Sequence, residues 1–144
     1  MYINGKPIKV NQDNLALNKR EKSNWLIHLL FIRQDYTECL KFVDELLEES
    51  ERKQDGERSE YALYLKALIL RIQGNIHDSL ELFKKCHLLN PNNIEYLKQF
   101  GRSLYLLGRH KQAIELFDEC LVLDQSDWEI YFYKGLSYRY MRQF

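Results

Sequence analysis

Proline and glycine are both rare in this sequence, which has 2 Pro and 6 Gly among its 144 residues. Because these two residues interrupt helices, their scarcity favours a helix-rich chain. With 45% hydrophobic and 29% charged residues, the composition indicates a folded protein and argues against disorder. The length suits one domain, or part of a larger protein, with a shared hydrophobic core.

The sequence also lacks a net charge, since 21 Lys and Arg residues balance 21 Asp and Glu residues. We therefore expect no long-range attraction to nucleic acid or to an anionic membrane. The longest nearly apolar run, Trp25–Ile32, contains His28 and is too short to span a bilayer. The first residues, Met1–Pro7, lack the apolar centre of a secretory signal. These features predict a cytoplasmic protein without direct membrane insertion.

Motifs for catalysis and cofactor binding are missing as well. The three cysteines include no CxxC pair, so a disulfide framework is not expected and a reducing compartment is favoured. No nucleotide-binding glycine loop, HExxH or GxSxG occurs, and the four histidines are scattered. An acidic run at Asp44–Glu51 lacks the spacing of a calcium loop and reads as a solvated helix face. The sequence therefore predicts no enzyme activity, no cofactor and no metal.

What the sequence does contain is a repeat with a period of 34 residues. Leu107–Phe117 (LGRHKQAIELF) matches Gln73–Phe83 (QGNIHDSLELF). Each copy reads as the end of one helix, a glycine turn and the start of a second helix, with Ala or Ser where the two helices touch. This period predicts an all-α tetratricopeptide-repeat solenoid of antiparallel helix pairs.

The repeat divides the chain into a flexible leader and an array. The leader is residues 1–20, and the repeats are about 21–59, 60–93, 94–127 and a partial 128–144. The first repeat is degenerate and 40 residues from the next, and its surplus fits Glu51–Gly56 as extra helix and loop. With about three and a half repeats and an aromatic last helix, we expect the amino-terminal part of a longer array.

Glycines mark two kinds of position in the repeat. Gly101 and Gly135 share one register position, where we expect two helices to cross too closely for a large side chain. Gly74 and Gly108 follow the first helix of their repeats and are expected to form left-handed turns.

The cysteines also occupy small positions of the repeat. Cys39 is equivalent to Ser79 and Ala113, and Cys86 is equivalent to Cys120. We expect all three cysteines to be compact buried side chains rather than metal ligands or nucleophiles.

The concave face of the solenoid is the candidate binding surface. The first helix of each pair lines this face, and helical spacing selects the side chains that point into it. Aromatic and basic residues, which are enriched at binding hot spots, dominate the selection. For any single residue, packing against the next repeat is an equally good interpretation; for the set, a partner-binding groove is favoured. The predicted groove residues are Tyr61, Tyr64, Arg71, Lys98, Arg102, Tyr105, Phe132, Arg139 and Tyr140.

Several runs of the sequence resemble the tetratricopeptide array of the fourth Bardet–Biedl syndrome protein family. The most specific is Asn24–Leu29 (NWLIHL). The others are Ile32–Tyr36 (IRQDY), Glu60–Tyr64 (EYALY), Gly74–Ile76, Ser79–Phe83, Arg102–Leu104, Leu107–Lys111, Asp127–Ile130 and Gln143–Phe144.

This resemblance implies a non-enzymatic subunit of the BBSome, a coat-like adaptor that carries membrane proteins into and out of cilia. It also implies protein partners, namely other BBSome subunits, ciliary cargo or transport adaptors linked to dynein. The implied locations are the cilium, the ciliary base and the centriolar satellites.

A co-chaperone module is the alternative function. Such a module would hold an acidic carboxy-terminal peptide through the cations Lys98, Arg102 and Arg139. The third repeat departs from that class, because Glu95 and Gln99 stand where a basic carboxylate clamp would be expected.

Overall fold

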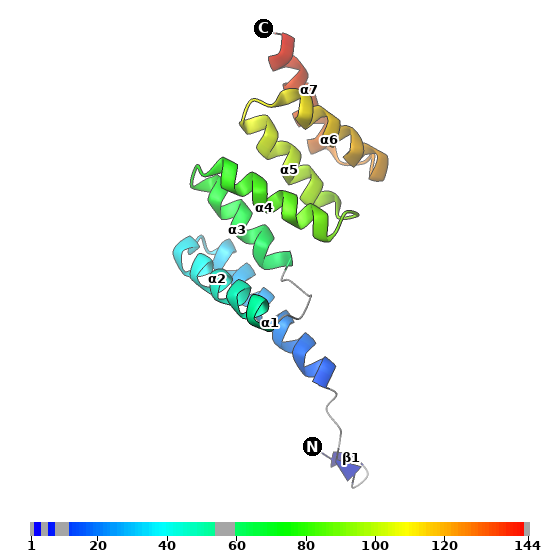
Figure 1. Ribbon diagram of the computed structural model, residues 1–144. Coiled ribbons are helices and arrows are strands. Elements are labelled where there is room, and N and C mark those ends of the chain that lie inside the picture. Colours follow the sequence, from blue (N-terminus) through cyan, green and yellow to red (C-terminus); the bar gives the residue numbers. More distant parts are fainter. Residues whose placement is uncertain (1, 4–5, 8–11, 54–59, 143–144) are drawn as a thin grey trace.

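The computed structural model describes residues 2–3, 6–7, 12–53 and 60–142. Within these residues the chain forms seven α-helices and one pair of very short strands. The helices are α1 Gln12–Ile32, α2 Tyr36–Lys53, α3 Glu60–Ile72, α4 Ile76–Leu89, α5 Ile94–Leu106, α6 His110–Leu123 and α7 Trp128–Arg142. The strands β1 (Tyr2–Ile3) and β2 (Lys6–Pro7) pair antiparallel and lie apart from the helices (Figure 1).

The helices form antiparallel hairpins that stack in chain order. The hairpins are α1–α2, α3–α4 and α5–α6, and α7 packs on both helices of the last one (Figure 1). Consecutive hairpins are also in contact, through α2 with α3 and through α4 with α5. The predicted all-α solenoid of antiparallel helix pairs is therefore confirmed.

Helix α1 starts earlier than the sequence analysis expected. It begins at Gln12, inside the stretch 1–20 that was assigned to a leader. Residues 12–20 carry few apolar side chains and so lack a helical pattern, yet they contain no Gly or Pro, and neither does the rest of 12–53. Helix propensity thus accounts for the early start of α1, and Lys19 in this stretch pairs with Glu49 of α2 at 3.4 Å. Helix α2 is also longer than α4 and α6, and the expected surplus loop falls on residues 54–59, outside the described part.

All three hairpins turn in the same way. In the second, Gly74 N–H donates to Arg71 O and Asn75 N–H donates to Leu70 O, a Schellman arrangement that ends α3. The third hairpin repeats both bonds around Gly108. Gly74 and Gly108 have φ of +89° and +78°, so the predicted left-handed turns are confirmed. In the first hairpin the same position is held by Gln34, with φ 62°.

Small side chains fill the core where helices meet. Cys39, Ser79 and Ala113 are all fully buried, as are Cys86 and Cys120, and the three cysteines are free thiols. Burial raises the pKa of the Cys86 and Cys120 thiols to about 12, so both stay protonated near neutral pH. The predicted role of the cysteines as compact buried side chains is confirmed.

The two glycines expected at close helix crossings behave differently. A Cβ atom built on Gly101 would lie 2.8 Å from Cε1 of Phe117, whose ring is fully buried. Gly101 therefore does mark a close crossing of α5 and α6. Gly135 occupies the same register position on α7, but a Cβ there would have no neighbour within 4 Å. For Gly135 the expectation is wrong within the described residues, because no later helix crosses α7 there.

This pair of glycines gives a matched test of the packing. We expect Gly101→Ala to lower the free energy of unfolding by about 1–3 kcal/mol, since the Phe117 ring has no free space into which to move. We expect Gly135→Ala to raise it by about 0.5–1 kcal/mol through helix propensity alone. Urea denaturation followed by circular dichroism measures both changes. Equal effects of the two substitutions would contradict the close crossing.

The turn at Gln34 gives a second test. Gln34→Gly removes the cost of a left-handed side chain, about 1 kcal/mol, and adds some entropy to the unfolded chain. We expect a net increase of about 0.5 kcal/mol in unfolding free energy. Gly74→Ala is the control and should lower it by about 1 kcal/mol, because the site has space but the wrong φ for alanine. A destabilised Gln34→Gly protein would rule out this account.

Candidate protein-binding face

The predicted groove residues of α3 reach across to α5. Tyr64 donates a hydrogen bond to Oε1 of Glu95 at 3.2 Å, and its ring lies 5.3 Å from that of Tyr96. Burial and the charge of Glu95 both raise the pKa of the Tyr64 hydroxyl, so it remains a neutral donor. Tyr61 lies beside Tyr64 and makes a hydrogen bond with Nδ1 of His28 on α1. These tyrosines join successive hairpins and are only partly open to a partner.

Arg71 is occupied in the same way. Its guanidinium donates to Oε1 of Gln99 at 2.6 Å and lies 5.3 Å from the centre of the Phe83 ring. A third contact reaches Oγ of Ser103 at 3.5 Å. Burial, together with the nearby Arg102, lowers the pKa of Arg71, although an arginine still carries its charge at neutral pH. The arginine thus joins α3 to α5 by polar contacts and to α4 by a cation–π contact.

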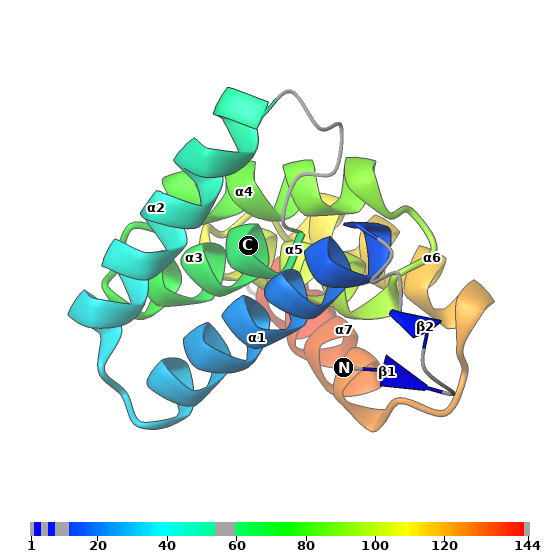
Figure 2. The same cartoon turned by 90° about the horizontal axis from the view of Figure 1, so that it is seen from below.

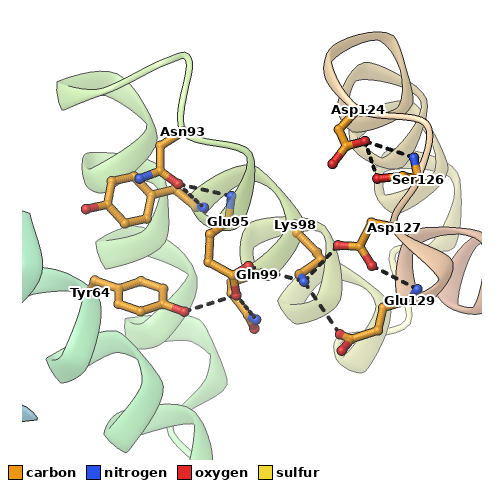
Figure 3. Close-up of polar contacts among 10 residues, drawn as sticks. Tyr64, Asn93, Glu95, Lys98, Gln99, Asp124, Ser126, Asp127 and Glu129 are labelled. Atoms are coloured by element: carbon orange, nitrogen blue, oxygen red, sulfur yellow. Dashed lines mark hydrogen bonds and ion pairs between the residues drawn. The ribbon is translucent and has the colours of Figure 1, made fainter.

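Lys98 of α5 lies at the centre of a cluster of carboxylates (Figure 3). Its Nζ is 3.0 Å from Oδ2 of Asp127, 3.2 Å from Oε2 of Glu95 and 3.7 Å from Oε2 of Glu129. Only 10% of the lysine side chain is exposed. Burial alone would lower the pKa of Lys98, but the hydrogen bonds to Asp127 and Glu95 outweigh it and the pKa is raised. Lys98 is therefore a fully paired cation that joins α5 to the start of α7.

Asp127 has a second role beside its ion pair. Its Oδ1 accepts a hydrogen bond at 3.0 Å from the backbone N–H of Glu129, in the first turn of α7. Asn93, one repeat earlier, caps α5 by accepting from the N–H groups of Glu95 and Tyr96. One carboxylate thus caps a helix and binds the preceding hairpin at the same time (Figure 3).

The last predicted groove residues gather where α5, α6 and α7 meet. The Tyr105 ring lies 5.4 Å from His110, 5.9 Å from Tyr133 and 6.0 Å from Tyr140. The rings of His110 and Tyr140 are stacked, with an angle of 9° between their planes. Arg102 lies over the Tyr133 ring at 5.2 Å. These contacts again join consecutive repeats, but they leave one edge of the cluster open.

That open edge belongs to α7. Phe132 is 51% exposed and Tyr140 is 43% exposed. Arg139, one residue before Tyr140, is exposed too, and no ion pair to it is recorded among the described residues. Of the nine predicted groove residues, these three are exposed, whereas the other six are half-buried or buried.

The sequence analysis did not identify the acceptors that neutralise the groove cations. Glu95, Gln99 and Asp127 supply the oxygens that hold Arg71 and Lys98. Glu95 and Gln99 were noted only as departures from a carboxylate clamp. The repeat register could have pointed to these acceptors, since Glu95 and Glu129, which both contact Lys98, occupy equivalent positions 34 residues apart on the first helices of their repeats.

In the part of the chain that the structure describes, no three His, Cys, Asp or Glu side chains lie close enough to hold a metal ion. In that part, too, no helix combines the length and the apolar character needed to cross a bilayer.

Comparison with known proteins agrees with this geometry. The stacked hairpins and the 34-residue register define a tetratricopeptide-repeat protein. A solved fungal tetratricopeptide domain, Sgt2 of Aspergillus fumigatus, superposes with a TM-score of 0.72 at 11% identity, covering 87% of this chain and 80% of that one. The family model described as "Anaphase-promoting complex, cyclosome, subunit 3" matches residues 50–120.

Within this class, the sequence is related to the BBS4 proteins and is similar to their tetratricopeptide region. The mouse protein "BBSome complex member BBS4" is 48% identical over 124 residues, which are 86% of this chain and 23% of that protein. The protein of the same description from Xenopus tropicalis is 45% identical over 122 residues, again 23% of its length. The chain thus spans about a quarter of the length of these curated relatives. The resemblance drawn from the sequence is confirmed.

The paired state of Lys98 can be tested by removing its charge. We expect Lys98→Met to lower the free energy of unfolding by about 1–3 kcal/mol, because Asp127 and Glu95 lose their counter-ion. Since the pKa of Lys98 is raised on folding, its stabilisation is present at neutral pH and is lost as the pH rises past the ordinary lysine value of 10.5. The difference in unfolding free energy between the two proteins should therefore stay constant from about pH 7 to 9 and narrow as the pH rises past 10.5.

Lys66 provides the control for this test. It pairs with Asp44 at 2.7 Å, but half of the Asp44 side chain is exposed. Lys66→Met should cost less than about 1 kcal/mol. Chemical denaturation across the pH range measures both variants, and equal costs for Lys98→Met and Lys66→Met would contradict the buried cluster.

Proposed function

We propose that this chain is a non-enzymatic protein-interaction scaffold and that it acts as part of a BBSome adaptor for ciliary membrane proteins. Its relatedness to BBS4 proteins over 86% of its length supports this proposal. The solenoid of stacked hairpins supports it too, because this architecture offers an extended concave surface rather than an enclosed reaction site. The partners would be other BBSome subunits, cargo segments or transport adaptors, in the cytoplasm at the ciliary base, in the cilium and at centriolar satellites.

The observation that carries the proposal is the contrast between buried and exposed residues in the predicted groove. Most aromatic and basic residues there are held between repeats, where they fix the shape of the groove. Phe132, Arg139 and Tyr140 are the exception, since α7 presents them largely exposed. An exposed arginine beside two aromatic rings is the composition expected of a binding hot spot. We therefore assign the contact with a partner to these three residues of α7.

The co-chaperone alternative is weakened by the same geometry. A carboxylate clamp needs cations with unused hydrogen-bonding capacity. Lys98 already faces three carboxylates, and Arg102 lies over the Tyr133 ring. A peptide carboxylate would have to displace Asp127 and Glu95 from Lys98 and would gain little in exchange. Of the three proposed clamp cations, Arg139 remains available.

The proposal predicts the effect of a double substitution on α7. In ciliated cells, Arg139→Glu/Tyr140→Ala should reduce recovery of the other BBSome subunits at least about tenfold, as loss of a hot spot costs about 2 kcal/mol or more. Affinity purification with quantitative mass spectrometry measures the recovery. Lys111→Glu/Val122→Ala is the matched control, because both of these residues are exposed on α6, the outer helix of its pair.

Two further measurements keep the outcome clear. Thermal unfolding of both purified variants shows that the fold is intact, since Tyr140 contacts Tyr105 and His110. Unchanged recovery with the α7 variant, or an equal loss with the α6 control, would overturn the assignment. Retained BBSome recovery together with lost binding of an acidic carboxy-terminal peptide would favour the co-chaperone function.

A further inference from the structure

The first helix of the stack exposes large apolar side chains. Trp25 is 67% exposed, Leu26 is 40% exposed and Leu29 is 39% exposed. Trp25 and Leu29 are one helical turn apart and therefore lie on the same side of α1. We call Trp25, Leu26 and Leu29 the end face. A contiguous exposed apolar surface of this kind in a folded protein marks a contact with another molecule.

The repeat register shows what kind of contact this is. Trp25 is equivalent to Leu65 of α3, and Leu29 is equivalent to Ile69, because the first two repeats are 40 residues apart. Leu65 is only 1% exposed and Ile69 is fully buried. Both belong to the core cluster that also contains residues of α1 and α2. The side of α3 that matches the end face is thus covered by the preceding hairpin.

The end face is therefore the continuation of an interface that the stack already uses. Terminal repeats of a soluble solenoid require a polar outer side, because no further repeat covers them. At this end the outer side carries a tryptophan and two leucines instead. Figure 2 looks along the stack from this end, with α1 and α2 in front of the later hairpins.

The charges around the end face select against other kinds of partner. Glu21 and Lys22 precede it on α1, and Arg33 follows it and pairs with Asp35 at 3.7 Å. Lys19 and Arg20 add positive charge before Glu21, and Lys19 pairs with Glu49 at 3.4 Å. Both signs of charge therefore surround the end face, in a chain with no net charge, which argues against attraction to a nucleic acid or an anionic membrane. A partner of the end face would therefore bind through apolar contact and complementary shape.

We infer that the end face docks an α-helical hairpin of another protein chain, which stacks end-on and extends the solenoid across the chain boundary. The docked hairpin would present small side chains at the contact, as α2 presents Cys39 to the core shared with α3. The inference rests on the proposed function in one respect, that the chain has protein partners. The surface itself is separate from the inner-face residues Phe132, Arg139 and Tyr140.

Site-specific cross-linking in ciliated cells tests this inference. A benzophenone amino acid replaces Trp25 in the protein as cells express it, and mass spectrometry maps the cross-linked peptides. We expect them to come from two antiparallel helices that are adjacent in one partner chain. Leu29→Glu should reduce these cross-links at least about tenfold by placing a charge in the apolar contact. The control position is Val122, which is 83% exposed on α6 and should not capture the same peptides.

The other outcomes overturn the inference. These are cross-links to residues 1–11 of the same chain, to a second copy of this chain, to an extended or non-helical segment, or none above the unirradiated sample. Because Leu29 is partly exposed, Leu29→Glu should keep the thermal unfolding midpoint of the unchanged protein, which separates lost docking from lost folding. Repeating the experiment with Arg139→Glu/Tyr140→Ala distinguishes the two proposals, since the end-face cross-links should persist even if the inner face has no partner.

Discussion

Contact between successive helix hairpins is the constraint on which the whole molecule depends. No single hairpin can bury both of its apolar sides, so each one is completed by its neighbours. The close approach of α5 and α6 requires Gly101 to have no side chain, because the ring of Phe117 takes that space. The equivalent position of the second repeat is held by Ala67, which is fully buried. Small residues at the helix crossings thus set how closely the helices approach one another.

Polar contacts run along the inner side of this apolar stack. Tyr64 and Arg71 reach from α3 to acceptors on α5, and Lys98 reaches from α5 to Asp127, just before α7, and to Glu129 on α7. The charge of Lys98 is balanced locally by three carboxylates, whereas Arg71 bonds the neutral amide of Gln99. Most of the predicted groove residues thus hold the hairpins together, while Phe132, Arg139 and Tyr140 on α7 are exposed.

The extent to which the sequence determined these features differs from element to element. The turns at Gly74 and Gly108 and the burial of Cys86 and Cys120 followed from the 34-residue register, because each of those positions depends on local geometry that repeats. The early start of α1 at Gln12 did not, since the sequence of residues 12–20 shows no hydrophobic pattern at helical spacing. The paired state of Lys98 could not be predicted either, because it depends on Asp127, which lies 29 residues further along the chain, just before α7, and whose capping role shows only in three dimensions.

Asp127 couples the capping of α7 to the ion pair with Lys98 of α5. The carboxylate accepts from the first turn of α7 and holds the ammonium group of α5, so the end of one repeat cannot fray without releasing a charge in the other. A force that pulls α7 away from α5 would therefore have to break the ion pair of Asp127 with Lys98 together with the cap of α7.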